Sequence, residues 1–209
     1  MPRHQVILIA IVAIVAAVGG GLLARGMLEE SGVPQAAMTA GTLLQPPRPL
    51  KNVDLVDHTG QPFDAARLKD RWTLLFFGFT NCPDVCPATL TILAQIEKRL
   101  QDLPDAQRPQ IALVSVDPER DTPEQLAKYV GFFSPNFIGV TGTPNSIDAF
   151  AGAMMVPVAK HKLPNGGYTV DHSAAIFLID PNGAMHALFS TPHDATKIAA
   201  DVRRIVGAQ

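Results

Sequence analysis

Both cysteines of this 209-residue chain lie in one short motif. Cys82 and Cys86 belong to the stretch FTNCPDVCP, which follows an apolar run and precedes a segment with helical periodicity. The first amides of a helix favour negative charge, so a thiol at such a position is expected to have a lowered pKa and to react or bind a metal. Three interpretations follow: a redox dithiol, a soft-metal site, or a structural disulfide or buried thiols. The last is disfavoured because so short a loop gains little from a disulfide.

The elements that must position this motif alternate between strands and helices. Apolar runs at 73–79 and 111–116 predict fully buried strands, and N-cap residues followed by proline, Thr122 and Thr143, predict two helix starts. Further strands are predicted at 52–56, 137–140, 156–160, 168–170, 174–180 and 184–190, and further helices from Pro87 and after Asp194. This order predicts an α/β fold with a mixed central sheet flanked by helices, in a thioredoxin-like arrangement.

A metal site at the cysteines needs another ligand, because two thiolates rarely complete one. Of six histidines, His172 lies in the segment VDHS, directly before the buried strand 174–180. In a thioredoxin-like sheet the start of that strand lies beside the cysteine motif, so His172 is expected to reach both sulfurs. Of the others, His4 is expected on the opposite side of the membrane, and His193 lies just before the last helix, as a surface residue. The remaining three are expected in a turn, a hairpin and an edge strand: His58, His161 and His186.

Two thiolates and one imidazole suit three-coordinate Cu(I), and an added weak oxygen or water ligand would allow Cu(II). Asp171 is a candidate outer-shell or axial group, or a cap of the turn. The charged residues Asp117, Glu119, Arg120 and Asp121 follow the strand 111–116. They are expected at the edge of the sheet where α/β folds place sites, as a docking rim or as an ion-paired turn before a helix.

Composition restricts the function further. Hydrophobic residues make up 47% of the chain, charged residues 17%, and the net charge is −2. This composition excludes a disordered chain and provides no basic surface for nucleic acid. Residues 6–24 carry no charge, and about 19 helical residues span roughly 28 Å, close to the thickness of the bilayer core. The segment is therefore an uncleaved membrane anchor or a long cleaved signal, with the anchor favoured.

The predicted organisation is a transmembrane anchor at 1–25, a flexible linker at 26–45 that is rich in small residues and proline, and a thioredoxin-like domain at 46–209. Arg3 before the apolar run weakly favours a cytoplasmic N-terminus. The expected location is a single-pass protein of the bacterial inner membrane, with its soluble domain in the periplasm.

The motifs FFGFTNCPDVCPATL, VSVDPERDTPEQLAKYV, VTGT and VDHSAAIFLID, in this order, closely resemble the Sco (SenC/PrrC) family. The resemblance covers residues 46–206. It implies a membrane-anchored copper protein that helps to assemble the binuclear copper centre of cytochrome c oxidase subunit II. It also implies that Cys82, Cys86 and His172 are the copper ligands. The hairpin between Val156 and Val170 is short and lacks the acidic run of some relatives.

Two functions are therefore expected to compete. The first is a copper metallochaperone, a transfer protein and not an enzyme, with subunit II, periplasmic copper donors and thiol reductants as partners. The alternative is a thiol-disulfide reductase in which Cys82 and Cys86 are the redox pair. A peroxiredoxin-like peroxidase is disfavoured because Thr80-Asn81-Cys82 lacks one residue of the T-x-x-C motif. His172 distinguishes the first two functions, since a dithiol reductase has no need of it.

Overall fold

The computed structural model describes residues 5, 35–51, 53–164 and 166–208. Residues 35–207 of this set belong to one compact unit. The strands are β1 (Gly41–Pro49), β2 (Asp54–Asp57), β3 (Pro62–Asp64), β4 (Thr73–Gly78), β5 (Gln110–Ser115), β6 (Ile138–Thr141), β7 (Val158–Lys162), β8 (Tyr168–His172), β9 (Ile176–Ile179) and β10 (Ala184–Phe189). The helices are a short 3-10 turn η1 (Gln35–Ala37) and α2 (Ala65–Leu68), α3 (Val85–Arg99), α4 (Pro123–Phe133), α5 (Pro144–Ala153) and α6 (Ala195–Val206).

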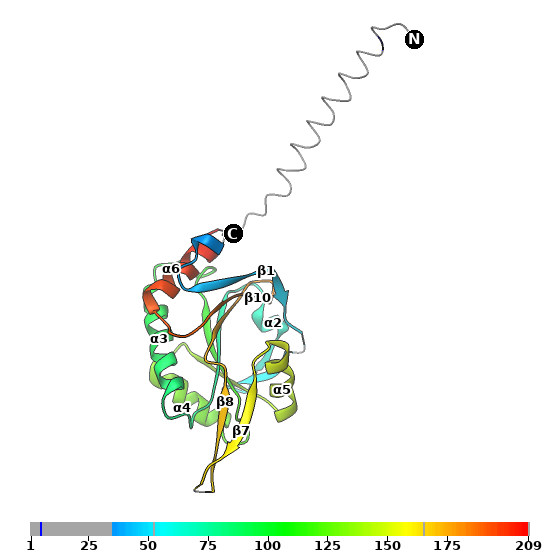
Figure 1. Cartoon of the computed structure of the whole chain (residues 1–209), viewed down its shortest axis with the longest axis vertical. Coiled ribbons are helices and arrows are strands. Elements are labelled where there is room, and N and C mark those ends of the chain that lie inside the picture. Colours follow the sequence, from blue (N-terminus) through cyan, green and yellow to red (C-terminus); the bar gives the residue numbers. More distant parts are fainter. Residues whose placement is uncertain (1–4, 6–34, 52, 165, 209) are drawn as a thin grey trace. The chain divides into compact units, whose positions relative to one another are not determined.

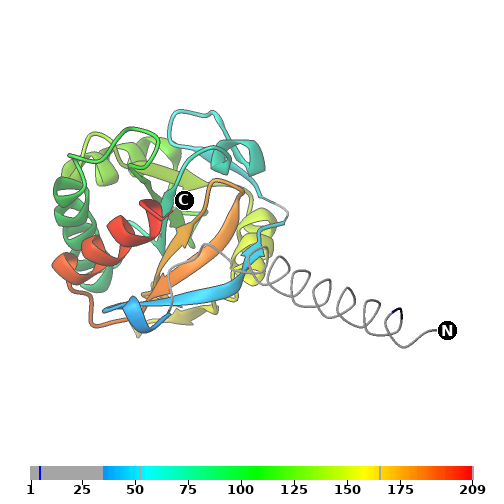
Figure 2. The ribbon, with the colours of Figure 1, turned by 90° about the horizontal axis from the view of Figure 1, so that it is seen from above.

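Eight strands form one mixed sheet in the order β1-β10-β9-β4-β5-β6-β2-β3. β4, β5 and β6 are parallel, whereas β9, β10 and β1 run antiparallel to their neighbours. Helices α3, α4 and α6 cover one face of this sheet and α5 covers the other (Figures 1 and 2). Every residue of β4 is buried, as its uninterrupted apolar sequence requires of a central strand with both faces covered. The predicted mixed α/β sheet with flanking helices is confirmed.

The predicted membrane anchor, with its uncharged run at 6–24, lies outside the described residues. Among the helices that are described, none has both the length and the apolar character needed to span a bilayer.

Strand β1 is an addition to the predicted elements. It begins at Gly41, inside the range predicted as a linker, and pairs antiparallel with β10. Its sequence GTLLQPPRP resembles a tether because of the two adjacent prolines, but β1 is an edge strand, where proline is tolerated. The register shifts between Leu43 and Arg48, on either side of these prolines. The domain therefore starts before residue 46.

A buried carboxylate on α6 fixes the chain where it enters β1. Asp201 is fully buried and accepts hydrogen bonds from the backbone N–H groups of Thr39, Ala40 and Gly41 at 2.7–3.0 Å. The Thr39 hydroxyl and Arg204 also donate to it. Burial raises the pKa of Asp201, but the hydrogen bonds from Ala40, Gly41 and Thr39 outweigh this effect and hold the pKa below its ordinary value.

Asp201→Asn is expected to lower the free energy of unfolding by about 3 kcal/mol at pH 7, because the new amide NH₂ faces backbone donors and leaves them unpaired. Since the pKa of Asp201 is lowered by folding, its stabilisation is present above the unfolded pKa of about 3.9 and is lost as the pH falls through the folded value. Chemical denaturation at pH 7 and at about pH 3 checks both statements. Asp148→Asn, on the exposed side of α5, is the control, with an expected change within about 0.5 kcal/mol. An equal loss in both variants would contradict the prediction.

Candidate metal centre

The two cysteines lie where the central strand β4 gives way to α3. Cys82 is in the loop that follows the strand, and Cys86 is in the first turn of α3, which begins at Val85. The helix thus starts two residues before the predicted Pro87, which falls within the first turn, where a missing N–H costs no intrahelical hydrogen bond. The N–H of Cys86 points at the Cys82 sulfur, with a distance of 3.4 Å from N to Sγ. This N–H has no intrahelical acceptor at the helix start and therefore donates to the Cys82 sulfur.

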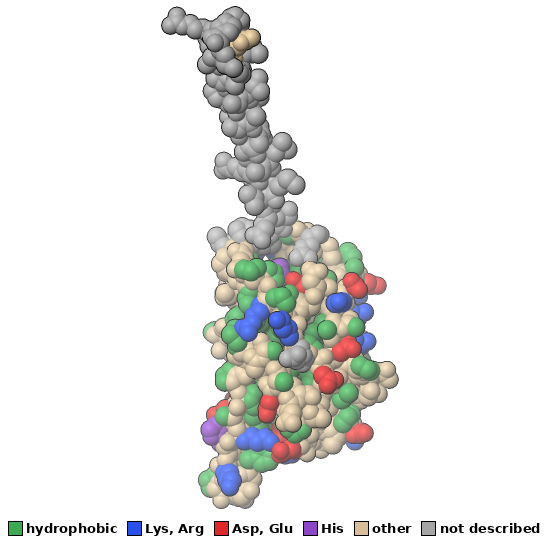
Figure 3. All heavy atoms as spheres, turned by 90° about the vertical axis from the view of Figure 1, so that its right-hand side faces the viewer, with side chains coloured by type: hydrophobic (Ala, Val, Ile, Leu, Met, Phe, Trp, Pro, Cys, Tyr) green, Lys and Arg blue, Asp and Glu red, His purple; other side chains and the backbone are tan. Residues whose placement is uncertain are grey.

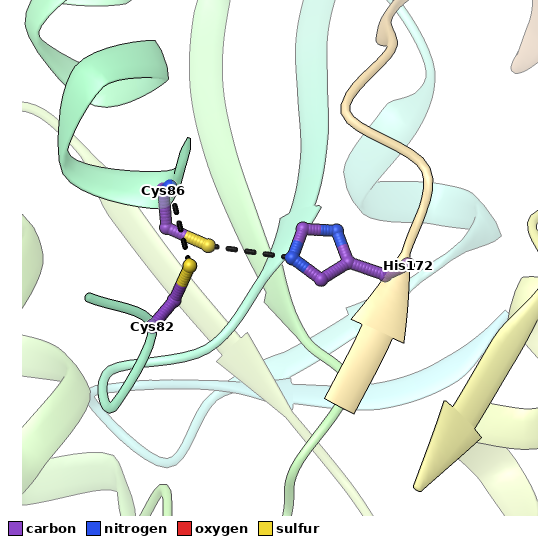
Figure 4. A group of neighbouring side chains, drawn as sticks. All are labelled: Cys82, Cys86 and His172. Carbon is purple, nitrogen blue, oxygen red and sulfur yellow. Dashed lines mark hydrogen bonds between the residues drawn. The ribbon is translucent and has the colours of Figure 1, made fainter. Parts of the chain in front are cut away.

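His172, the last residue of β8, faces the two cysteines from the opposite side of the site (Figure 4). Its Nε2 lies 3.4 Å from the Sγ of Cys86. Its Nδ1 lies 3.0 Å from the carbonyl oxygen of Ser173, which can only accept, so Nδ1 carries the proton and the Nε2 lone pair faces the sulfur. The rings of Phe76 and Phe79 make edge contacts with the imidazole. These contacts fix the ring in the orientation that a metal ligand needs.

The structure thus brings together all three residues that the sequence suggests as ligands. The two sulfurs and one ring nitrogen lie within 4.8 Å of one another. Metal–ligand bonds of about 2.0–2.3 Å place the ligands of one ion at most about 4.6 Å apart, so only a small adjustment is needed. Two sulfurs and one imidazole are donors that Cu(I) prefers. Mg²⁺ and Ca²⁺ require oxygen ligands, and this group of three side chains offers none.

Burial, and not the helix start, dominates the chemistry of Cys86. Its side chain is fully buried, and the loss of hydration raises the pKa of its thiol far above the ordinary value. The expectation of a lowered pKa is therefore wrong for Cys86. Burial also lowers the pKa of His172. Without a metal, the Cys86 thiol and the His172 imidazole are consequently both neutral at physiological pH. A metal that binds Cys86 as a thiolate must therefore displace a proton.

Cys82 is the more accessible sulfur. It lines a groove of about 280 Å³ that runs between the cysteine loop and β8 and also contains Val85, Val170 and His172. Val85 is 45% exposed and forms an apolar rim beside the sulfur. A partner's ligand that enters this groove meets Cys82 and His172 before it meets Cys86.

Gly78, the last residue of β4, leaves room for the buried sulfur. A Cβ at this position would lie 3.0 Å from the Cys86 Sγ and 2.9 Å from a Leu113 methyl carbon. Contacts under or near 3.0 Å force a displacement, so the space that holds Cys86 depends on this glycine. The sequence contains the signal, a glycine at the end of a buried apolar run, but does not say what it accommodates.

The remaining candidate residues do not join the group of sulfurs and imidazole. Asp171 is exposed, pairs with His161 at 2.9 Å and lines the same groove as Cys82 and His172. His58 accepts from the Gly139 N–H, and His193 lies 3.2 Å from the carbonyl oxygen of Phe189. His186 faces Asp180.

The charged stretch after β5 forms the ion-paired turn that was one of its two predicted roles. Arg120 pairs with buried Asp117, and Glu119 pairs with Lys160 at 2.9 Å.

Two tyrosines near the site were not predicted. Tyr168 donates to Asp117, and the hydroxyl of Tyr129 is buried without a hydrogen-bond partner among the described residues. Burial raises the pKa of Tyr129, and the nearby Cys86, Cys82 and Asp121 add smaller contributions in the same direction.

Comparisons with known proteins identify the family that this chain matches. The SCO1/SenC family model matches residues 45–207. A mitochondrial SCO2 homolog from Mus musculus is 37% identical over 155 residues, which are 74% of this chain and 61% of the mouse protein. The structure of Arabidopsis thaliana ScoI with copper bound is 32% identical with a TM-score of 0.70, covering 74% of this chain and 96% of that one. Bradyrhizobium japonicum ScoI with copper bound is 34% identical with a TM-score of 0.67, covering 76% and 98%.

Proposed function

Because the chain belongs to the SCO1/SenC family, we propose that it is a copper metallochaperone that holds its cargo through Cys82, Cys86 and His172. The observation that carries the proposal is the convergence of two sulfurs and the imidazole Nε2 within 4.8 Å. The similarity to two ScoI proteins whose structures contain copper supports the same metal. Two thiolates and a neutral imidazole give a low-coordinate, soft site, which favours Cu(I).

The same geometry suggests how copper would be transferred to a partner protein. Cys86 is buried behind the other two ligands, whereas Cys82 and His172 line the groove. A thiolate or imidazole of a partner can therefore approach the metal from the groove and replace these ligands one at a time. Reprotonation of the buried thiol, whose pKa is raised, favours the metal-free state after transfer.

We further propose, from the resemblance of the motifs to the family, that the acceptor is the binuclear copper centre of cytochrome c oxidase subunit II. Periplasmic copper donors would load the site, and thiol reductants would keep it loadable. The anchor at 6–24 would hold the protein in a bacterial inner membrane with the domain in the periplasm. A full-length protein that resists carbonate extraction, with a domain cleaved by protease from the periplasmic side only, would support this topology.

A second candidate function is thiol-disulfide reduction of the acceptor's cysteines before metal insertion. It is favoured by the free state of both cysteines and by the groove at Cys82, since an accessible thiol can attack a disulfide. It does not require His172, so a reductase that never binds copper would be indifferent to that residue.

The test is an anaerobic titration of the reduced full-length chain with Cu(I) against a competing chelator. We expect one copper ion per chain, because the site offers one set of three donors. Adding a copper-free fragment of subunit II should then remove the copper, which is followed by metal analysis after separation. A reduced chain that bound no copper but reduced the disulfide of the fragment would support the reductase in its place.

A further inference from the structure

One loop contacts both segments that carry the candidate ligands. Residues 117–121, called here the bridging loop, connect β5 to the helix cap of α4. One end of the bridging loop holds the loop of the two cysteines, and the rest holds the β7–β8 hairpin that ends in His172. Neither the metal preference nor the proposed transfer assigns a role to these residues.

The contact with the cysteine side is made by Asp121, which is fully buried. Its carboxylate accepts hydrogen bonds from the N–H and hydroxyl of Thr80 at 3.0 and 2.6 Å, and from the hydroxyl of Ser115 at 2.6 Å. Thr80 is two residues from Cys82. Charge-assisted hydrogen bonds of this length are strong, so Asp121 fixes the start of the cysteine loop to β5.

The contact with the histidine side is made by Arg120 and Asp117. The hydroxyl of Tyr168 donates to Asp117 at 2.7 Å, and the guanidinium of Arg120 donates to the Tyr168 carbonyl oxygen at 3.1 Å. The guanidinium also lies 3.8 Å from the centre of the Tyr168 ring and pairs with Asp117. Tyr168 is the first residue of β8, and His172 is the last.

These contacts matter because the hairpin has little other support. Among the described strands, β7 and β8 pair only with each other, as a separate two-stranded sheet. The hairpin projects from the domain, with lysine, acidic and histidine side chains gathered on it (Figures 1 and 3). The buried side chain of Val170 and an outer ion pair between Lys160 and Glu119 also hold it, and Glu119 again belongs to the bridging loop.

We propose that the bridging loop positions the ligands by setting the distance between the two thiols and His172, with Arg120 and Tyr168 as the positioning residues on the histidine side. This inference rests on the proposed copper site. The Arg120 guanidinium and the Tyr168 hydroxyl bond to Asp117 and to the start of β8, not to the candidate ligands. Both residues act by fixing β8, which carries the imidazole. Loosening Tyr168 should therefore displace His172 while the two cysteines keep their geometry.

Tyr168→Phe removes the hydroxyl that donates to Asp117 and keeps the ring under Arg120. In the reduced full-length chain we expect about a tenfold weaker affinity for Cu(I), the effect of one hydrogen bond to a charged group. In the metal-free chain, hydrogen exchange of the backbone amides in 158–172 should be faster, whereas exchange in α3 should be unchanged. Arg120→Lys should have the same pattern, since lysine supplies neither the planar stack nor the second hydrogen bond.

The matched control is Arg203→Lys. Arg203 holds exposed Asp102 through two nitrogens at 2.9 and 2.7 Å, away from the copper site, so copper affinity and hairpin exchange should both equal those of the parent. The proposal is overturned if Tyr168→Phe keeps the parent's copper affinity. It is also overturned if exchange in α3 rises together with exchange in the hairpin, because that pattern indicates general loss of stability. If the parent itself bound no copper, the proposed function would fail, while the exchange measurement would still decide whether the bridging loop fixes the hairpin.

Discussion

Replacing His172 with alanine is expected to lower the affinity of the reduced chain for Cu(I) by more than about 100-fold. Loss of an outer-shell partner of a metal ligand commonly costs about 10–100-fold, and this substitution removes a ligand itself. The imidazole Nε2 is the only donor that faces the sulfurs from the hairpin side in the group that the structure describes. The two remaining thiolates would form an incomplete site that a competing chelator empties. The measurement is a competition titration with Cu(I) under reducing, anaerobic conditions.

Two histidines outside the site provide matched controls for this loss. His186→Ala and His193→Ala remove imidazoles that face Asp180 and the Phe189 carbonyl oxygen, respectively. Both variants should bind one copper ion with the affinity of the parent. If His172→Ala bound copper as tightly as the parent, the choice of the third ligand would be wrong. If all three variants lost copper, the effect would reflect the fold and not the site.

The elements around the candidate site could be predicted from the sequence because most of them have a strong local signal. The apolar run of β4 identifies a central strand, the capping residues Thr122 and Thr143 accept the hydrogen bonds expected of helix caps, and His172 lies directly before a buried strand. Once the fold class is known, chain topology alone brings the histidine to the cysteines. Convergence of residues 86 positions apart could therefore be predicted without any pairwise signal between them.

The contacts that hold these elements in place could not be predicted in the same way. Tyr168 follows the sequence Asn-Gly-Gly, which carries no signal for it, and its hydrogen bond to Asp117 joins residues 51 positions apart. The hydrogen bonds from Thr39, Ala40 and Gly41 to Asp201 join residues at least 160 positions apart. The local sequence contains no sign of them, so its prolines predict a tether where the structure has β1. The pKa of Cys86 is raised where the sequence predicts that it is lowered, and this difference has a similar origin. The helix start is visible in the sequence, but the depth of burial, which dominates here, depends on packing by distant residues.

Oxidation of the cysteine pair is expected to abolish copper binding. Formation of a disulfide releases two protons and two electrons to an oxidant, and it joins the sulfurs at about 2.05 Å. In the reduced protein these sulfurs lie within 4.8 Å of each other, so a short movement of the accessible Cys82 toward Cys86 closes the bond. Each sulfur can then no longer act as an anionic ligand, and the imidazole of His172 alone cannot hold the metal. Copper loading and disulfide formation are therefore mutually exclusive states of one site.

The exclusion can be separated into its parts with two variants and a mild thiol oxidant such as diamide. Cys86→Ser should lose both copper binding and the disulfide, because it removes a sulfur from each state. His172→Ala should lose stable copper and still form the disulfide, because both sulfurs remain. Thiols are counted by mass spectrometry, and copper is measured on the same samples. A fully oxidised parent that retained one copper ion at this site would contradict the prediction. If the exclusion holds, delivery of copper leaves a pair of thiols that can oxidise, and reloading then requires a reductant.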